Sequence, residues 1–142
     1  MNRTAELLAR LPLFAALDER SMQAVATLAR NVSAPSGTVV MREGEPADAF
    51  FVIVRGTVHI ERLGGVTRSM TNGGFFGEIA LFEASPRTAT ATCATDCEFL
   101  KLGGFEFGRV MTTFPDIRTK VEAAVARRPH TADAGNAEAS SD

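Results

Sequence analysis

The segment from Gly73 to Thr90 contains the residues best suited to chemistry, because it combines several glycines with Glu78 and one arginine. The glycines allow the backbone to turn tightly and to approach a ligand closely. Glu78–Phe82 is long enough for one helical turn, and the first N–H groups of that turn could hold a phosphate. Arg87 is the only cation of the segment, and a guanidinium can bind two phosphate oxygens at once. An ionised Glu78 only accepts hydrogen bonds, so it suits a sugar hydroxyl rather than the phosphate.

Two familiar types of glycine-rich loop do not fit this segment. The chain has no Gly-Lys-Ser/Thr sequence, so the segment is not a nucleotide triphosphate loop of the Walker A type. The spacing from Gly73 to Gly77 does not match the dinucleotide-binding pattern either. No nucleophile with its base and no pair of acids stands out, and two cysteines with two histidines leave little material for a zinc site. The sequence therefore predicts ligand binding without catalysis and without a metal.

The composition narrows the class of protein further. The chain has 142 residues, which favours a single domain with its own core. Fifteen lysines and arginines stand against 17 aspartates and glutamates, and a net charge of −2 is too acidic for a general nucleic-acid binder. No apolar run approaches the ~20 residues of a membrane span, and Leu11–Leu17 is too short for a signal peptide. We therefore expect a cytoplasmic protein with no membrane contact of its own, in which Cys93 and Cys97 are free thiols.

The elements that must position this segment begin with helices and continue with short strands. Leu7, Leu8 and Leu11 share one helical face, and Asp18 is a good N-cap for a second helix that continues to Ala29. The continuous apolar run at Phe50–Val54 is typical of a strand buried on both faces. The other expected strands are Thr38–Arg42, a stretch at 58–61 in which His59 faces solvent, Val66–Thr71 after a tight two-residue turn at Gly64-Gly65, Arg87–Thr95 and Glu98–Leu102.

Helical periodicity returns after Gly103-Gly104. Phe107–Phe114 has an apolar stripe, Pro115 breaks it, and Asp116 can cap a last helix that runs to Arg128. Residues 129–142 have no apolar side chain larger than alanine, so we expect a disordered C-terminal tail after a domain formed by residues 1–128. This order of elements predicts an α+β domain with a small antiparallel barrel or roll.

The segment closely resembles a known motif. Phe-Gly-Glu-x-Ala-Leu at 76–81, a short spacer and Pro-Arg-Thr-Ala-Thr at 86–90 resemble the phosphate-binding cassette of the cyclic nucleotide-binding domain family. The resemblance extends from about Leu11 to Arg128, and it includes the turn at Glu43–Glu45 and Gly56 between two strands. It implies an eight-stranded antiparallel, jelly-roll-like β-roll, flanked by N-terminal and C-terminal helices, which agrees with the pattern of elements above.

The resemblance also implies roles for individual residues. Glu78 matches the glutamate that binds the ribose 2′-hydroxyl, and Arg87 matches the arginine that pairs with the cyclic phosphate. Thr88 matches a position that can reach the phosphate or the base, and it does not by itself decide between cAMP and cGMP. Met70 could pack near the base as well as in the core. The ligand-binding residues that the resemblance implies are Phe76, Gly77, Glu78, Ile79, Ala80, Leu81, Arg87, Thr88 and Ala89.

The family usually closes its site with the last helix, so Lys120, Arg127 or Arg128 could approach the base, although each also suits an ordinary place near a helix C-terminus. We expect a non-catalytic sensor of cAMP or cGMP that has no cofactor and signals through its C-terminal helices to a protein partner or an attached effector domain. Two alternatives remain open. The chain could be the C-terminal regulatory domain of a channel or transporter, or a protein-interaction module whose pocket is vestigial.

Overall fold

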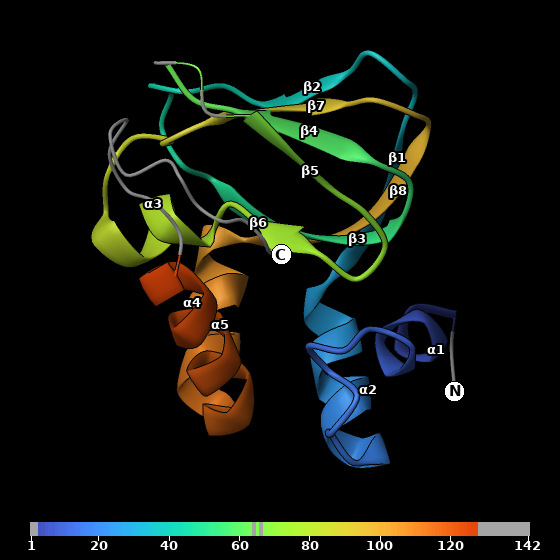
Figure 1. Cartoon of the computed structure of the whole chain (residues 1–142). Coiled ribbons are helices and arrows are strands. Elements are labelled where there is room, and N and C mark those ends of the chain that lie inside the picture. Colours follow the sequence, from blue (N-terminus) through green and yellow to red (C-terminus); the bar gives the residue numbers. More distant parts are fainter. Residues whose placement is uncertain (1–2, 64, 66, 128–142) are drawn as a thin grey trace.

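The computed structural model describes residues 3–63, 65 and 67–127 (Figure 1). Within them, eight strands form two antiparallel four-stranded sheets, as the sequence predicts. The first sheet has the order β1-β8-β3-β6, built from β1 (Arg30–Ala34), β8 (Cys97–Gly103), β3 (Ala49–Arg55) and β6 (Phe75–Phe76). The second has the order β2-β7-β4-β5, built from β2 (Val39–Met41), β7 (Thr90–Cys93), β4 (Val58–Glu61) and β5 (Thr67–Met70).

The two sheets pack face to face and enclose one of the two hydrophobic cores. Alternation along each strand directs one set of side chains inward, as the pattern of buried Val58 and Ile60 with exposed His59 and Glu61 illustrates. Phe51, Phe76 and Phe99 lie together in this core, with ring centroids 5.2–5.9 Å apart. The remaining buried members are Met41, Ala49, Ile53, Val58, Ile60, Met70, Ala89, Ala91, Cys93 and Cys97.

Strand β3 separates this core from a second one on the outer face of its sheet. Phe51 and Ile53 point into the roll, whereas Phe50 and Val52 contact the helices, so the run is buried on both faces as the sequence predicts. The helices are α1 (Arg3–Ala9), α2 (Glu19–Leu28), α4 (Gly104–Thr113) and α5 (Pro115–Arg127), and all four lie on the same side of the roll (Figure 1). Their apolar faces join one core.

The ends of the helices follow local sequence signals. The Asp18 carboxylate accepts a hydrogen bond from the Ser21 backbone N–H at 2.8 Å, which confirms the predicted N-cap of α2. The predicted cap at Asp116 is wrong, because α5 begins one residue earlier, at Pro115. Proline is favoured at the first helical position, since its missing N–H would have no partner there and its φ is already helical. No helix in the described ranges is long and apolar enough to cross a membrane.

Several strand predictions also need correction. β1 at Arg30–Ala34 and the two-residue β6 have no counterpart among the predicted strands, and α2 ends at Leu28 rather than Ala29. Pairing begins at Thr90 in β7, three residues after the predicted Arg87 start. β4 and β5 form the predicted hairpin. The predicted turn at Gly64-Gly65 includes Gly64, which, like Val66, lies outside the described residues. The predicted tail at 129–142 also lies outside them.

Candidate ligand-binding site

The guanidinium of Arg87 is buried at the junction of three segments. Its Nη2 donates to the Ala49 carbonyl oxygen at 2.7 Å and to Asp48 Oδ1 at 3.2 Å, and its Nη1 donates to the Gly77 carbonyl oxygen at 3.0 Å. The Arg87 side chain is 2% exposed, whereas that of Asp48 is 80% exposed. Burial lowers the pKa of Arg87, and the charges of Asp48 and Glu78 oppose that shift. A cation is therefore fixed in a largely dehydrated position.

The backbone of Arg87 is held as firmly as its side chain. Its N–H donates to the Glu45 carbonyl oxygen at 2.8 Å, and its own carbonyl oxygen accepts from the Gly44 N–H at 2.9 Å. Gly44 has a φ of +89°, a conformation that suits glycine. The turn at 43–45 therefore fixes the backbone of Arg87, the residue after Pro86, through these two hydrogen bonds.

Gly77 connects β6 to α3 (Glu78–Glu83), the single short helix beside the roll (Figure 1). Its φ is +95°, and a Cβ there would lie 3.0 Å from both the Ala49 carbonyl oxygen and Arg87 Nη1. Two independent constraints therefore require glycine: the left-handed backbone and the close approach of the arginine. The helix ends at Ala84, which has an unusual positive φ of 51° for a residue with a side chain.

Glu78 is the first residue of α3, and its side chain is fully buried. A buried carboxylate beside a buried guanidinium is one of the few stable arrangements for a charge away from water. The two side chains come from opposite ends of the cassette, which we define as residues 76–90. The fold therefore brings together the guanidinium of Arg87 and the carboxylate of Glu78 beside one pocket.

A small, partly open cavity of about 30 Å³ lies beside these two residues. One side is the cassette, and the other side is the inner face of the sheet β2-β7-β4-β5. This volume is far below the usual range for small-molecule sites, so these residues outline a site that must open before it encloses a ligand of nucleotide size. The lining residues are Met41, Ile60, Arg68, Phe76, Gly77, Glu78, Ile79, Ala80, Arg87, Thr88 and Ala89.

Eight of the nine predicted site residues are in this lining, and Leu81 is the exception. Leu81 packs against the helical core and lines a groove on the other side of α3 with Pro46 and Ala84. Met70 does not line the pocket either. It is 3% exposed in the core of the roll, so of the two predicted positions, near the base or in the core, the core position is correct.

The last helix does not line the pocket with any residue that the structure describes, although α5 contacts α3. The Lys120 amine instead donates to the Pro12 carbonyl oxygen, at 3.2 Å, in the connection between α1 and α2. The expected approach of Lys120 to the base is therefore not observed in this arrangement. The side chain of Arg127 and all of Arg128 lie outside the described part of the chain.

Sequence reasoning missed three lining residues, namely Met41, Ile60 and Arg68. Ile60 and Arg68 are register partners on β4 and β5. Arg68 is half-buried between exposed Thr67 and Ser69, so it points toward the inside of the roll. A cation at an inward position of a strand is a recognisable signal, but it becomes readable only when the strand pairing is known.

Comparison with known proteins agrees with this geometry. The family model of the cyclic nucleotide-binding domain matches residues 31–114, which is more than half of the chain and contains the whole cassette. The chain belongs to the cyclic nucleotide-binding domain family. It is a non-catalytic sensor domain, as the sequence predicts.

Curated relatives of this cyclic nucleotide-binding domain are channels and kinase regulators. A cyclic nucleotide-gated potassium channel of Mesorhizobium japonicum is 34% identical over 115 residues, which cover 81% of this chain and 32% of the channel. The cAMP-dependent protein kinase regulatory subunit of Aspergillus niger is 31% identical over 117 residues, 81% of this chain and 28% of that protein. The domain thus spans about a third of the length of these relatives.

Solved structures share the fold of the domain. A cAMP-bound PfPKA-R structure has a TM-score of 0.75 and 25% identity, and the match covers 86% of this chain and 43% of the other. PKAR CBD2 bound to Sp-2Cl-cAMPS has a TM-score of 0.74 and 27% identity, with 84% and 83% covered. In the described ranges no group of three or more histidine, cysteine, aspartate or glutamate side chains could hold a metal ion.

Proposed function

We propose that the pocket binds cAMP or cGMP with the cyclic phosphate against Arg87. The position of the guanidinium supports this, because three short contacts with Ala49, Gly77 and Asp48 fix its plane before any ligand arrives. A phosphate held out of water needs a cation, and a guanidinium offers two parallel N–H donors to two phosphate oxygens. Within the described part of the cassette, Arg87 is the cation that can do this.

The ribose belongs beside Glu78 in this proposal. Its buried carboxylate accepts hydrogen bonds and would repel a phosphate, but it suits the neutral 2′-hydroxyl. The spacing between the two residues in the pocket then orients the nucleotide, with its phosphate and sugar on the cassette. The base then contacts the opposite wall of the pocket, which is formed by Met41, Ile60 and Arg68.

The base wall has a feature that bears on nucleotide preference. Arg68 carries only hydrogen-bond donors, and the O6 and N7 atoms of guanine both accept, whereas adenine presents an N6 donor beside its N7 acceptor. Arg68 therefore stabilises bound guanine more than bound adenine. Thr88 lies in the same lining, and its hydroxyl can donate or accept, so it serves either base. We infer that both nucleotides bind and that Arg68 contributes selectively to cGMP.

The output of the sensor in this proposal passes through the C-terminal helices to a protein partner or an attached effector domain. The contact between α3 and α5 supports it, since α3 carries Glu78 into the pocket. The channel relatives in Mesorhizobium japonicum and Rhizobium etli favour a channel regulatory domain as a second candidate, whereas the Aspergillus relatives favour a kinase regulator. Intact Glu78 and Arg87 argue against a vestigial pocket.

Parallel calorimetric titrations of the chain with cAMP, cGMP and linear 5′-AMP test the proposal. We expect saturable binding of both cyclic nucleotides at one site per chain. Linear 5′-AMP should bind at least tenfold more weakly, because its dianionic phosphate does not present the compact cyclic diester to Arg87. Absence of measurable heat with either cyclic nucleotide, in a sample with a cooperative thermal unfolding transition, would refute the proposed function.

A further inference from the structure

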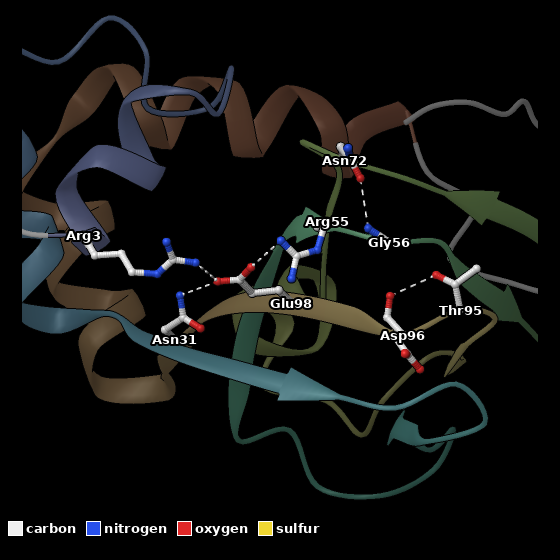
Figure 2. Close-up of polar contacts among 8 residues, drawn as sticks. All are labelled: Arg3, Asn31, Arg55, Gly56, Asn72, Thr95, Asp96 and Glu98. Carbon is white, nitrogen blue, oxygen red and sulfur yellow. Dashed lines mark hydrogen bonds and ion pairs between the residues drawn. The ribbon is translucent and has the colours of Figure 1, made fainter.

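A second buried charge lies away from the pocket, on β8. Glu98 is 3% exposed, and its carboxylate contacts side chains from three different elements through two hydrogen bonds and one further ion pair (Figure 2). Arg3 Nη2 on α1 lies 3.0 Å from Glu98 Oε2, Asn31 Nδ2 on β1 lies 2.7 Å from the same oxygen, and Arg55 Nη1 on β3 lies 3.3 Å from Oε1. The carboxylate is buried, whereas the Arg3 and Arg55 side chains that pair with it are 69% and 71% exposed.

The two arginines differ in what they connect. Arg55 stands opposite Glu98 in the β3–β8 ladder, so their ion pair lies within one sheet. Arg3 belongs to α1, so its ion pair joins the helical side of the molecule to the roll. Loss of Arg3 would remove the polar contact between α1 and β8, whereas loss of Arg55 would leave that contact in place.

The position of α1 is linked to that of α5. Leu8 and Leu11 belong to the same hydrophobic core as Ile117 and Val121, so apolar packing connects the N-terminal and C-terminal helices. The Lys120–Pro12 hydrogen bond adds a polar connection between the same two parts. A displacement of α5 toward the pocket would therefore pull on the α1–α2 segment and, through Arg3, on Glu98.

In this structure, none of the described residues of α5 lines the pocket. We propose that the Arg3–Glu98 ion pair is an autoinhibitory latch that holds the helices in this arrangement and opposes closure of α5 over a bound nucleotide. The proposal rests on the function proposed above. It requires that the ion pair is stronger in this arrangement than in the closed one, and the latch then lowers apparent affinity by lowering the population of the closed state.

The test compares Arg3→Ala with Arg55→Ala by calorimetric titration with cAMP and with cGMP. Both substitutions remove one exposed arginine from the same carboxylate, so they change the net charge of the protein in the same way. Arg3→Ala should tighten binding of both nucleotides by about two- to fivefold, the range of an ion pair with one exposed partner. Arg55→Ala should bind as wild type does. Lys120→Met should also tighten binding, since it releases α5 from Pro12.

Arg3→Ala and Arg55→Ala with equal affinities would overturn the latch, and so would weaker binding by Arg3→Ala than by Arg55→Ala. A thermal unfolding curve on each variant verifies that the fold is intact, and Arg3→Gln provides a milder variant if the alanine does not fold. If wild-type protein binds neither nucleotide, the proposed function fails first. If wild-type protein binds and the two arginine variants are equal, the latch alone fails.

Discussion

Arg87 Nη2 donates to the carbonyl oxygen of Ala49, the first residue of β3, at 2.7 Å. This contact ties the cation of the cassette to a strand that pairs with both β6 and β8 and is buried on both faces. The guanidinium is consequently oriented by backbone atoms that mutation cannot easily remove. A preorganised donor of this kind loses little side-chain entropy when an anion binds.

We expect Arg87→Ala to weaken cyclic nucleotide binding by roughly 2–5 kcal/mol, which is about 30-fold or more, because it removes one partner of a buried charge pair. Arg87→Lys should recover only part, since an ammonium cannot make the planar two-point contact. Calorimetry measures both, with Arg109→Ala on the exposed face of α4 as the control. Binding of cAMP by Arg87→Ala within about threefold of wild type would mean that the phosphate lies elsewhere.

Gly77→Ala should both destabilise the domain and abolish tight binding. The left-handed φ of +95° costs roughly 1–3 kcal/mol with a side chain, and the added Cβ meets the Ala49 carbonyl oxygen and the guanidinium of Arg87. Gly108→Ala is the matched control, because Gly108 lies in α4 and a Cβ added there has nothing within 4 Å. That control should gain up to about 1 kcal/mol. Thermal unfolding and cyclic nucleotide titration of both variants test this. Equal stabilities and equal affinities of the two variants would contradict the prediction.

Base selection can be measured as a ratio of affinities. Arg68→Ala and Thr88→Ala should each lower affinity for cGMP more than for cAMP, with Arg68→Ala having the larger effect because it loses a donor pair that suits guanine O6 and N7. The loss for cGMP should be about tenfold, the scale of one good contact to a base edge. Parallel titrations with both nucleotides provide the readout. Equal losses for the two nucleotides would show that neither residue distinguishes the bases.

The last helix should become more protected when ligand binds. Pro115 starts α5 directly after Phe114, whose φ of −121° and ψ of 88° are not helical, so the α4–α5 junction is a natural hinge. At saturating cAMP or cGMP, amide hydrogen exchange in α5 should slow, while exchange in β3 should change little. Unchanged exchange in α5 at saturation would mean that this helix does not respond to the pocket.

Glu98 should contribute to stability in a pH-dependent manner. Hydrogen bonding from Asn31 and the charges of Arg3 and Arg55 lower the pKa of Glu98 below its ordinary value of 4.5. A folded-state pKa below the unfolded one adds stability above pH 4.5, and that stability is lost as the pH falls through the folded pKa. Glu98→Gln should therefore flatten the acid side of the stability profile. Urea unfolding from about pH 3 to about pH 7 measures this, and identical slopes for both proteins would contradict it.

The parts of the fold that sequence predicts well are those with strong local signals. Asp18 is identifiable as a helix cap because its side chain satisfies a backbone N–H three residues later. The cassette is readable because Glu78 and Arg87 have defined roles at a fixed spacing in the family. β1, in contrast, contains Val32 as its single large apolar residue, and it is a strand because it pairs with β8. Such pairing is a tertiary effect that local propensity does not encode.

The base wall of the pocket cannot be assembled from sequence for the same reason. Met41, Ile60 and Arg68 come from three strands, and their meeting depends on register, including the irregularity between Val39 and Met41 in β2. A one-residue change of register would direct Arg68 into solvent. The position of α5 escapes prediction because tertiary contacts decide it: Ile117 and Val121 join the helical core, and the helix contacts α4 and α3.

The double-sided burial of β3 has a consequence for how the domain loses its structure. Phe50 and Val52 complete the core under the helices, while Phe51 and Ile53 complete the core of the roll. Neither core can unfold without exposing one face of this strand to water, so we expect the two cores to unfold together. Heat should produce one calorimetric transition whose van't Hoff and calorimetric enthalpies agree. The helices and the roll thus form a single cooperative unit, although the helices come from both ends of the chain and the strands from its middle.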